Sequence, residues 1–175
     1  MNSFNFSLPD ATVVHLEATA IDPTQHQIRL TVRTFGVSCS CPGCQCLSQR
    51  IHSHYQRQLA DLPWSDYQVS LQLQTRKFFC DNPACQRKIF TERFASVALP
   101  WARCTVRLNR QLSQIGLIVG GQAGRRLSAD CHVPRSRNTF LRRAKRAPLP
   151  VFPTPKWWAS TTLPFAKDRL TERSL

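Results

Sequence analysis

The chain has 175 residues, 42% of them hydrophobic, and carries a formal net charge of +14. This length suits one domain of ordinary size or two small ones, and the longest apolar run, GLIVGG at 116–121, is far too short to cross a bilayer. The N-terminus also lacks the basic and apolar segments of a secretory signal. We therefore expect a cytoplasmic protein with no membrane partner, whose cysteines stay reduced and favour metal binding over disulfides.

The first ninety residues predict a β-rich unit. Residues 13–21 and 27–37 alternate apolar and polar side chains around the turn sequence DPTQ, which predicts two strands joined by a turn. A longer strand is predicted within 67–80, and the shorter run 55–64 is its expected hairpin partner. One face of the longer strand carries the side chains expected in the core: Val69, Leu71, Leu73 and Thr75.

Two cysteine pairs have the spacing of a zinc site. Cys41 and Cys44 form a C-x2-C knuckle whose Pro and Gly favour a tight turn, and Cys80 and Cys85 form a C-x4-C knuckle. A hairpin between the two pairs can bring all four thiolates to one Zn²⁺, which makes a closed structural site. The alternative is a group of four unliganded thiols in a small core.

The other cysteines have less favourable spacing. Cys39 and Cys46 flank the first knuckle at C-x-C spacing, so we interpret them as spare thiols, or as ligands only if the register differs. Cys104 and Cys131 are interpreted as small buried residues. One of two histidines could replace a cysteine at the metal, although ordinary strand or loop positions are the simpler interpretation: His52 and His54.

The second half of the chain is basic and helical. Residues 101–147 carry eleven Lys and Arg against one acid, Asp130, which indicates a polyanion partner such as nucleic acid rather than only a solvated face. A helix over 105–121 is predicted to end at Gly120-Gly121, with one apolar stripe: Leu108, Leu112, Ile115 and Val119. A short second helix is predicted over 122–131, with an inner face of Ala123, Leu127 and Cys131.

A third helix follows the break at 132–134. Ser136 is its expected N-cap, and Phe140, Leu141 and Ala144 are its expected inner face. The outline is that of a helix-turn-helix, in which the last helix enters the major groove; a plain three-helix bundle with a basic surface is the alternative. The expected base readers are Arg135, Arg137, Asn138 and Thr139. The expected phosphate contacts are Arg142, Arg143, Lys145 and Arg146, and the further DNA-binding candidates are Arg125 and Arg126.

These motifs resemble a known family. The stretches CPGC, RIHSHYQRQLADLPW, RKFFCDNPACQRKIFTERF and SRNTFLRR are similar to the N-terminal part of ISL-three insertion-sequence transposases, over roughly residues 10–147. The resemblance implies a four-cysteine zinc finger at Cys41, Cys44, Cys80 and Cys85, followed by a helix-turn-helix, both binding the terminal inverted repeats of the element. In that family a catalytic domain with an acidic triad and two Mg²⁺ follows, whereas this sequence stops at residue 175.

The tail over 148–175 is irregular and rich in proline. Asp168 and Glu172 lie between basic residues, which indicates a solvated salt-bridge pair rather than a catalytic site. Reading one base out of frame from Trp157-Trp158 permits the string VGVDDFAFRKGQTYGTI, which resembles the stretch around the family's first catalytic aspartate. We hypothesise that the chain from 148–156 onward is translated out of frame. An early stop codon in the alternative frame of the gene would contradict this.

The sequence thus predicts an α+β protein with three parts: a β-rich zinc-binding domain over 1–95, a helix-turn-helix domain over 101–147 and the tail. We expect one structural Zn²⁺, binding to double-stranded DNA at transposon inverted repeats, no catalysis by this chain, and a prokaryotic, nucleoid-associated location. Further candidate partners are a second copy of this chain, in a homodimer, and the full-length transposase. The alternatives are a stand-alone zinc-containing regulator or RNA-binding protein, and a subunit or frameshift partner of an active transposase.

Overall fold

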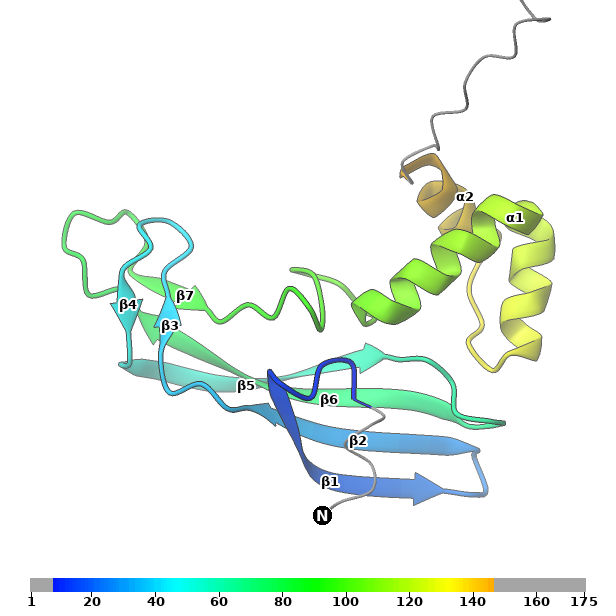
Figure 1. Ribbon diagram of the computed structural model, residues 1–175, viewed down its shortest axis with the longest axis horizontal. Helices are drawn as coiled ribbons and strands as arrows, with labels where there is room; N and C mark the ends of the chain where they lie inside the picture. Colours follow the sequence, from blue (N-terminus) through cyan, green and yellow to red (C-terminus); the bar gives the residue numbers. More distant parts are fainter. Residues whose placement is uncertain (1–7, 147–175) are drawn as a thin grey trace, which may run out of the picture.

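The computed structural model describes residues 8–146, which form a mixed α+β arrangement with a β-sheet between a cysteine-bearing end and a helical end (Figure 1). The main sheet has the strand order β1-β2-β6-β5, with β7 paired to β6, and a second sheet pairs β3 with β4. The tail, including Trp157-Trp158, Asp168 and Glu172, lies outside the described residues. The strands are β1 (Val14–Asp22), β2 (Gln27–Thr34), β3 (Cys39–Ser40), β4 (Leu47–Ser48), β5 (Ile51–Ala60), β6 (Gln68–Phe79) and β7 (Ile89–Thr91), and the helices are α1 (Val106–Asp130) and α2 (Arg137–Arg146).

The predicted first hairpin is confirmed. Strands β1 and β2 pair antiparallel, from Val14 opposite Thr34 to Asp22 opposite Gln27. The Asp22 carboxylate stabilises the turn, because its Oδ1 accepts from the backbone N–H groups of Thr24 at 3.0 Å and Gln25 at 3.1 Å. Strand β2 ends at Thr34 rather than at residue 37, since the chain leaves the sheet there toward the cysteine-bearing end.

The second predicted hairpin is also present, but its first strand is shifted toward the N-terminus, and β5 ends at Ala60 rather than at residue 64. Strand β5 begins at Ile51, four residues before the predicted start, and pairs antiparallel with β6. The sequence pattern did not indicate that β2 and β6 pair in parallel, from Gln27 opposite Gln68 to Arg33 opposite Gln74. This pairing joins the two hairpins into one sheet. The predicted inner face of β6 is buried, and it packs in a core with Ile28, Leu30, Val32, Leu59, Phe94 and Val97.

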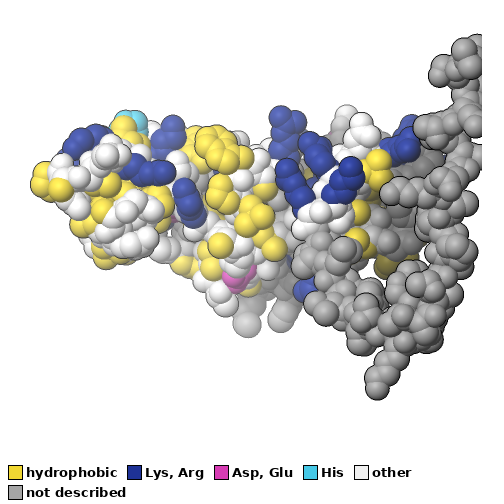
Figure 2. All heavy atoms as spheres, turned by 90° about the horizontal axis from the view of Figure 1, so that it is seen from above, with side chains coloured by type: hydrophobic (Ala, Val, Ile, Leu, Met, Phe, Trp, Pro, Cys, Tyr) yellow, Lys and Arg dark blue, Asp and Glu magenta, His cyan; other side chains and the backbone are white. Residues whose placement is uncertain are grey.

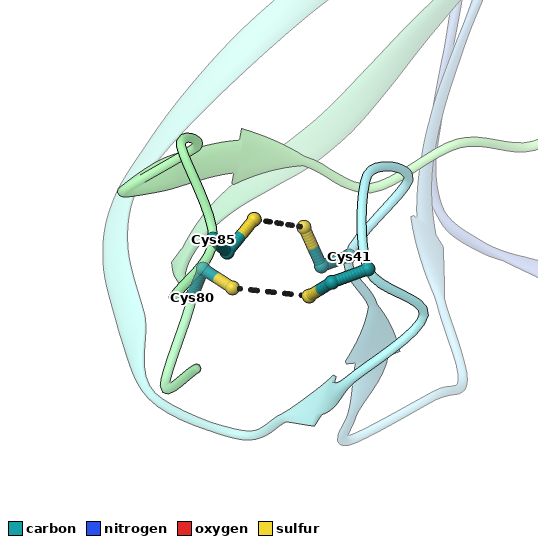
Figure 3. A group of neighbouring side chains, drawn as sticks. Cys41, Cys80 and Cys85 are labelled. Carbon is teal, nitrogen blue, oxygen red and sulfur yellow. Dashed lines mark hydrogen bonds between the residues drawn. The ribbon is translucent and has the colours of Figure 1, made fainter. Parts of the chain in front are cut away.

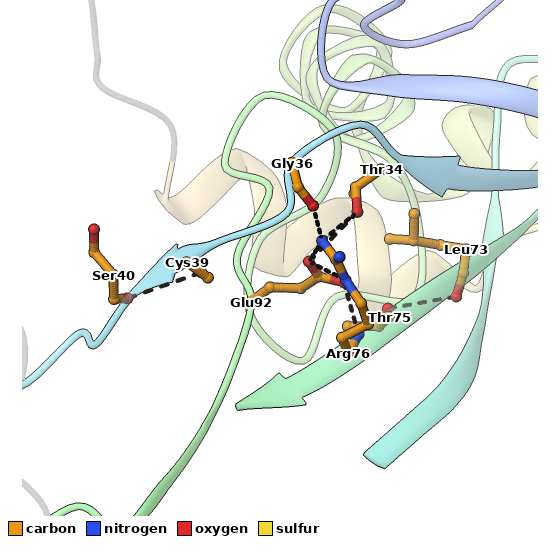
Figure 4. Close-up of polar contacts among 8 residues, drawn as sticks. All are labelled: Thr34, Gly36, Cys39, Ser40, Leu73, Thr75, Arg76 and Glu92. Carbon is orange, nitrogen blue, oxygen red and sulfur yellow. Dashed lines mark hydrogen bonds and ion pairs between the residues drawn. The ribbon is translucent and has the colours of Figure 1, made fainter. Parts of the chain in front are cut away.

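A buried ion pair fastens β7 to the sheet (Figure 4). The Glu92 side chain is 3% exposed, and one of its oxygens lies 2.8 Å from Arg76 Nη2. Its other oxygen accepts from the backbone N–H of Arg76 at 2.6 Å. The same guanidinium donates to Thr34 Oγ1 at 2.9 Å and to the Gly36 carbonyl. Arg76 and Glu92 therefore hold three segments together: the end of β2, the middle of β6 and the residue after β7.

Helix α1 is broken by a glycine. Thr105 caps its N-terminus, since the Thr105 side chain accepts from the N–H of Leu108 at 3.3 Å. Gly120 has φ 75° and ψ −170°, a conformation that is open to glycine and costly for other residues. The first helix was predicted to end at this point. The break has no loop, and Figure 1 shows the two halves of α1 meeting at a sharp bend.

The predicted inner face of α1 is correct from Leu108 to Ile115 and wrong from Val119 onward. Leu108 and Leu112 are buried and Ile115 is half-buried, but Val119 is 41% exposed. In the second half, the three residues predicted to face inward are all exposed: Ala123, Leu127 and Cys131. The buried positions there are Gly121, Gly124 and Ser128.

The second half of α1 buries Gly121, Gly124 and Ser128 because α2 lies very close to the small residues of α1. Phe140 of α2 is fully buried, and a Cβ on Gly124 would lie 3.1 Å from its ring. A Cβ on Gly116 would lie 3.0 Å from the Phe140 carbonyl oxygen, and one on Gly121 would lie 2.9 Å from Leu141. The predicted apolar stripe therefore gave the wrong interface residues, because glycines, which have no side chain, form the surface of α1 that α2 contacts.

The start of α2 agrees with the prediction. Ser136 Oγ accepts from the N–H of Thr139 at 3.3 Å, as expected of an N-cap. Of the three residues predicted to face inward, Phe140 is buried and Ala144 is half-buried. Leu141 touches the Gly121 backbone region but keeps 36% of its surface exposed, so it lies at the edge of the interface.

One carboxylate joins the sheet to the helices. Asp61, directly after β5, is 1% exposed and receives two hydrogen bonds from the Arg107 guanidinium, at 2.8 and 2.6 Å. Thr105 Oγ1 also donates to Asp61, at 2.6 Å. Backbone bonds between Ala60 and the segment before α1 continue this contact. The position of the helical end is therefore set by the residues at the end of β5.

Candidate zinc centre and basic groove

The first cysteine knuckle lies between β3 and β4. The pairing of these two short strands brings the chain back on itself, and the backbone N–H of Cys41 donates to the Cys46 carbonyl at 2.9 Å. The N–H of Gln45 then donates to the Cys41 carbonyl at 2.8 Å, with Gln45 at φ 60°. This tight turn places the thiols of Cys41 and Cys44 on the same side of the loop between β3 and β4.

The second knuckle lies between β6 and β7. The N–H of Cys80 donates to the Lys88 carbonyl at 2.8 Å, and the N–H of Cys85 donates to the Asn82 carbonyl at 3.1 Å. Asn82 also accepts with its side chain, from the N–H of Ala84 at 3.0 Å. The Asn-Pro sequence thus forms the turn that brings the two thiols together.

The four predicted ligands meet at one point (Figure 3). Their sulfur atoms all lie within 4.8 Å of one another, with 3.9 Å between Cys41 and Cys85 and 3.5 Å between Cys44 and Cys80. Four thiolates about 2.3 Å from a tetrahedral Zn²⁺ would be about 3.8 Å apart. The donor set and its spacing fit this ion, and the site therefore holds one structural zinc.

The electrostatics of the cluster also require a cation. The backbone N–H groups of Gly43 and Cys44 lower the pKa of Cys41 to about 7. The N–H of Asn82 lowers the pKa of Cys80, but burial and the neighbouring thiols outweigh it and raise that pKa to about 12. One thiol therefore ionises readily at the expense of the others, and full ionisation of the cluster at neutral pH needs a positive ion.

The remaining cysteines and histidines lie elsewhere. The sulfurs of Cys39 and Cys46 approach the carbonyls of the next residues, each at 3.9 Å, and lie outside the group of four. Cys104 is buried as predicted, but Cys131 is exposed, because it caps the end of α1 with its side chain turned to solvent. The two exposed histidines of β5 also lie outside the thiol group: His52 and His54.

The predicted DNA-binding residues lie on α2, in the turn before it and in the second half of α1. Most of them are exposed: Arg125, Arg126, Arg137, Asn138, Arg142, Lys145 and Arg146. Three others are half-buried against the segment before α1: Arg135, Thr139 and Arg143. On the face shown in Figure 2, Lys and Arg side chains gather in two groups, one at the cysteine-bearing end and one toward the helical end.

The half-buried residues line a groove. Arg143 Nη2 donates to Cys104 Sγ at 3.3 Å, while its Nη1 is buried and has no hydrogen-bond partner among residues 8–146. The groove has a volume of about 1090 Å³ and lies between α2, the first half of α1 and the segment 99–104. We call it the arginine groove after its five cationic lining residues: Arg103, Arg135, Arg142, Arg143 and Arg146.

Two residues of this groove were not predicted from the sequence: Trp101 and Arg103. They lie in the short connection PWARC, which has no period and no recognisable spacing. Trp101 is 97% exposed at the mouth of the groove. A tryptophan is usually assigned to a core, so its place at the surface could not be inferred without the fold.

Comparison with known proteins identifies the class of the cysteine-bearing part. Residues 38–88 match a family model described as the zinc-finger of transposase IS204/IS1001/IS1096/IS1165. This segment contains both knuckles and the hairpin between them, and it is similar to the zinc ribbon of these transposases. Such a ribbon indicates nucleic-acid binding. Searches of curated proteins and of solved structures found no match.

Neither α1 nor α2 combines the length and the apolar character that a bilayer crossing requires.

Proposed function

We propose that this chain binds double-stranded DNA in a sequence-specific way, at the terminal inverted repeats of an insertion sequence, as the DNA-binding part of an ISL-three-type transposase. The observation that carries the proposal is the zinc-ribbon match over 38–88, with a basic helical unit that begins at Val106 in the same chain. Zinc stabilises the fold of the ribbon and takes no part in chemistry, because four thiolates leave no open coordination position.

The geometry around α2 supports a helix-turn-helix. The second half of α1, the turn over 131–136 and α2 follow one another, and Phe140 fixes α2 against α1. Residues two positions before and after Phe140 lie on roughly the opposite face of a helix with 3.6 residues per turn. Asn138 and Arg142 occupy these positions and are exposed, as a helix in the major groove requires.

A binding experiment tests this proposal. The zinc-loaded protein is used to select preferred duplexes from a randomised library, and the enriched sequence is compared with inverted repeats flanking the gene. We expect Asn138→Ala to cost about 1–3 kcal/mol at the preferred site and to relax its sequence preference. Arg142→Gln should instead weaken binding to every duplex and lower the salt slope by about 0.9, since one phosphate contact is lost.

Three outcomes would contradict the proposal. If selection enriches no sequence, the helix is not a base reader. If RNA of matched sequence competes as well as duplex DNA, the RNA-binding alternative is favoured, and a preferred site unrelated to flanking repeats would favour a stand-alone regulator. Arg143 is unsuited to this comparison, because its guanidinium contacts Cys104 and its replacement would also disturb packing.

We propose further that this chain alone does not cut DNA and acts beside a full-length transposase. In support, the candidate metal ligands that meet among residues 8–146 are four thiolates, which leave a tetrahedral ion no open position for a substrate. Supercoiled plasmid incubated with the protein and Mg²⁺ should stay intact. Nicking that occurs when Mg²⁺ is supplied and is absent when Mg²⁺ is left out would contradict this.

A further inference from the structure

Trp101 is held rigidly at the surface. The N–H of Ala102 donates to the Leu99 carbonyl at 3.1 Å, which forms a turn around Trp101. Arg57 of β5 fastens this turn, since its Nη2 donates to the carbonyls of Ala102 at 3.0 Å and Leu99 at 3.4 Å. The backbone of Trp101 has φ 61°, which is uncommon for a bulky residue. A fixed turn therefore presents the indole to solvent, 97% exposed, next to the arginine groove.

The arginine groove has no neutralising partner of its own. Its lining within the described residues contains five arginines and no Asp or Glu. Arg143 has a buried Nη1 without a hydrogen-bond partner among these residues. Burial lowers the pKa of Arg135, and the nearby charge of Arg143 lowers it further. Two guanidinium groups so placed are stabilised by an anion between them, and a phosphate group has the matching geometry.

A second cavity continues from Trp101 toward the zinc ribbon. Its volume is about 460 Å³, and Trp101 and Ala102 line both cavities. At its far end lie Pro42 of the first knuckle and Arg87 beside the second. The one acid in its lining, Glu92, is already paired with Arg76. The path from the ribbon to α2 is therefore basic at both ends, with a free aromatic face at its midpoint.

We propose that this path binds a single strand of DNA, with its phosphates in the arginine groove and an unpaired base stacked on Trp101. A positively charged groove beside an exposed aromatic side chain is the arrangement by which proteins hold single strands. A base paired within a duplex offers no free face to an indole, whereas a base in a single-stranded end does. The proposal rests on the proposed function for the class of ligand, and its groove shares Arg142, Arg143 and Arg146 with α2, whereas Trp101 and Arg103 lie outside that helix.

The test compares three DNA probes with the zinc-loaded full chain: a twelve-residue oligothymidine, a blunt duplex and the same duplex with a single-stranded tail. Trp101→Ala should weaken binding of the oligothymidine and of the tailed duplex about 5- to 150-fold, the range expected for one lost stacking contact. Binding of the blunt duplex should stay within about twofold. Trp101→Phe should restore part of the loss, since phenylalanine keeps a ring.

A matched pair of arginine variants tests the groove. Arg103→Gln should lower the salt slope for the oligothymidine by about 0.7, the value for one phosphate of a single strand. Arg110→Gln removes the same charge from an exposed position of α1 outside the groove, and it should leave this slope unchanged. Phe35→Ala is the control for loss of an exposed aromatic ring at another site.

Three results would overturn the proposal: no binding of oligothymidine by the wild type, equal loss on all three probes with Trp101→Ala, or equal slopes for the two arginine variants. Failure of the proposed function looks different. In that case the blunt duplexes show no sequence preference, while the effects of Trp101→Ala on the oligothymidine persist.

Discussion

At the scale of single residues, the ligand cysteines are distinguished from the other four by position alone. All eight have the same chemistry, but only those of the two knuckles lie within 4.8 Å of one another. Backbone N–H groups point toward Cys41 and Cys80 and lower the pKa of each thiol, although burial and the neighbouring thiols raise the pKa of Cys80 overall. The difference between a structural metal ligand and a spare thiol is therefore a matter of turn geometry.

Replacing a ligand should remove the zinc. Cys41→Ser or Cys85→Ser leaves three thiolates around the ion, and in such sites the metal-binding energy is also folding energy. We expect loss of the one Zn²⁺ per chain in metal analysis, together with loss of ordered structure in 38–88. The matched controls Cys39→Ser, Cys46→Ser, Cys104→Ser and Cys131→Ser should keep the metal. Equal zinc loss in all of these variants would contradict the assignment.

Gly124 should be intolerant of a side chain. A Cβ at this position lies 3.1 Å from the Phe140 ring, which is fully buried and cannot move away. We expect Gly124→Ala to lower the free energy of unfolding by about 1–3 kcal/mol through overpacking, despite the better helix propensity of alanine. Gly36→Ala is the control, because its new Cβ meets only ordinary contacts. Chemical denaturation, monitored by circular dichroism, measures the stability of both variants. Equal stabilities would contradict the close packing of Phe140 on Gly124.

At the scale of elements, two of the ion pairs among residues 8–146 differ in how much they stabilise the fold. Glu17 and Arg33 pair across β1 and β2 at 3.0 Å, but the Arg33 side chain is half exposed. Asp61 and Arg107 pair at 2.6 Å with the carboxylate fully buried, and this contact joins β5 to α1. Exposed pairs contribute little because water and salt screen them, whereas breaking a buried pair leaves a charge without compensation.

This contrast gives a prediction for the link between sheet and helices. Asp61→Asn should lower the free energy of unfolding by about 3 kcal/mol, because it weakens the bonds from both Arg107 and Thr105 in a buried setting. Glu17→Gln should change it by less than about 1 kcal/mol. Denaturant titration measures both values. Similar effects of the two substitutions would show that Asp61 does not anchor the helical end.

At the scale of the whole molecule, three separate buried clusters lie along its length. One lies in the sheet around Leu71, one surrounds the thiols with Phe78 and Phe90, and one lies beneath the helices around Phe140. The second cluster contains few apolar side chains besides the cysteines. Its stability should therefore depend on the metal, while the other two depend on apolar burial.

Zinc removal should consequently unfold one end of the molecule. After treatment with a chelator, hydrogen exchange should show loss of protection around β3, β4 and β7. Amides of β2 and of the first half of α1 should stay protected, because their clusters contain no thiol ligand. Uniform loss of protection along residues 8–146 would instead show that the three clusters fold as one cooperative unit.

The sequence by itself determined the features that depend on neighbouring residues. The turn DPTQ and the flanking alternation determined the first hairpin, the knuckle spacings determined the zinc ligands, and Gly120 determined the break in α1. Each of these features follows from local backbone preferences or from a turn of only a few residues. The resemblance to the transposase zinc finger was likewise carried by short motifs, and the match over 38–88 supports it for that segment.

Only the tertiary structure decided the features that depend on distant partners. The parallel pairing of β2 with β6 joins segments forty residues apart, and no local pattern specifies it. The inner face of the second half of α1 was predicted wrongly, because Phe140 selects glycines rather than apolar side chains as its contact surface. Trp101 is exposed for a similar reason. Arg57, which is distant in the sequence and lies in β5, holds the turn that points the Trp101 ring toward solvent. The arginine groove forms between this turn and α2.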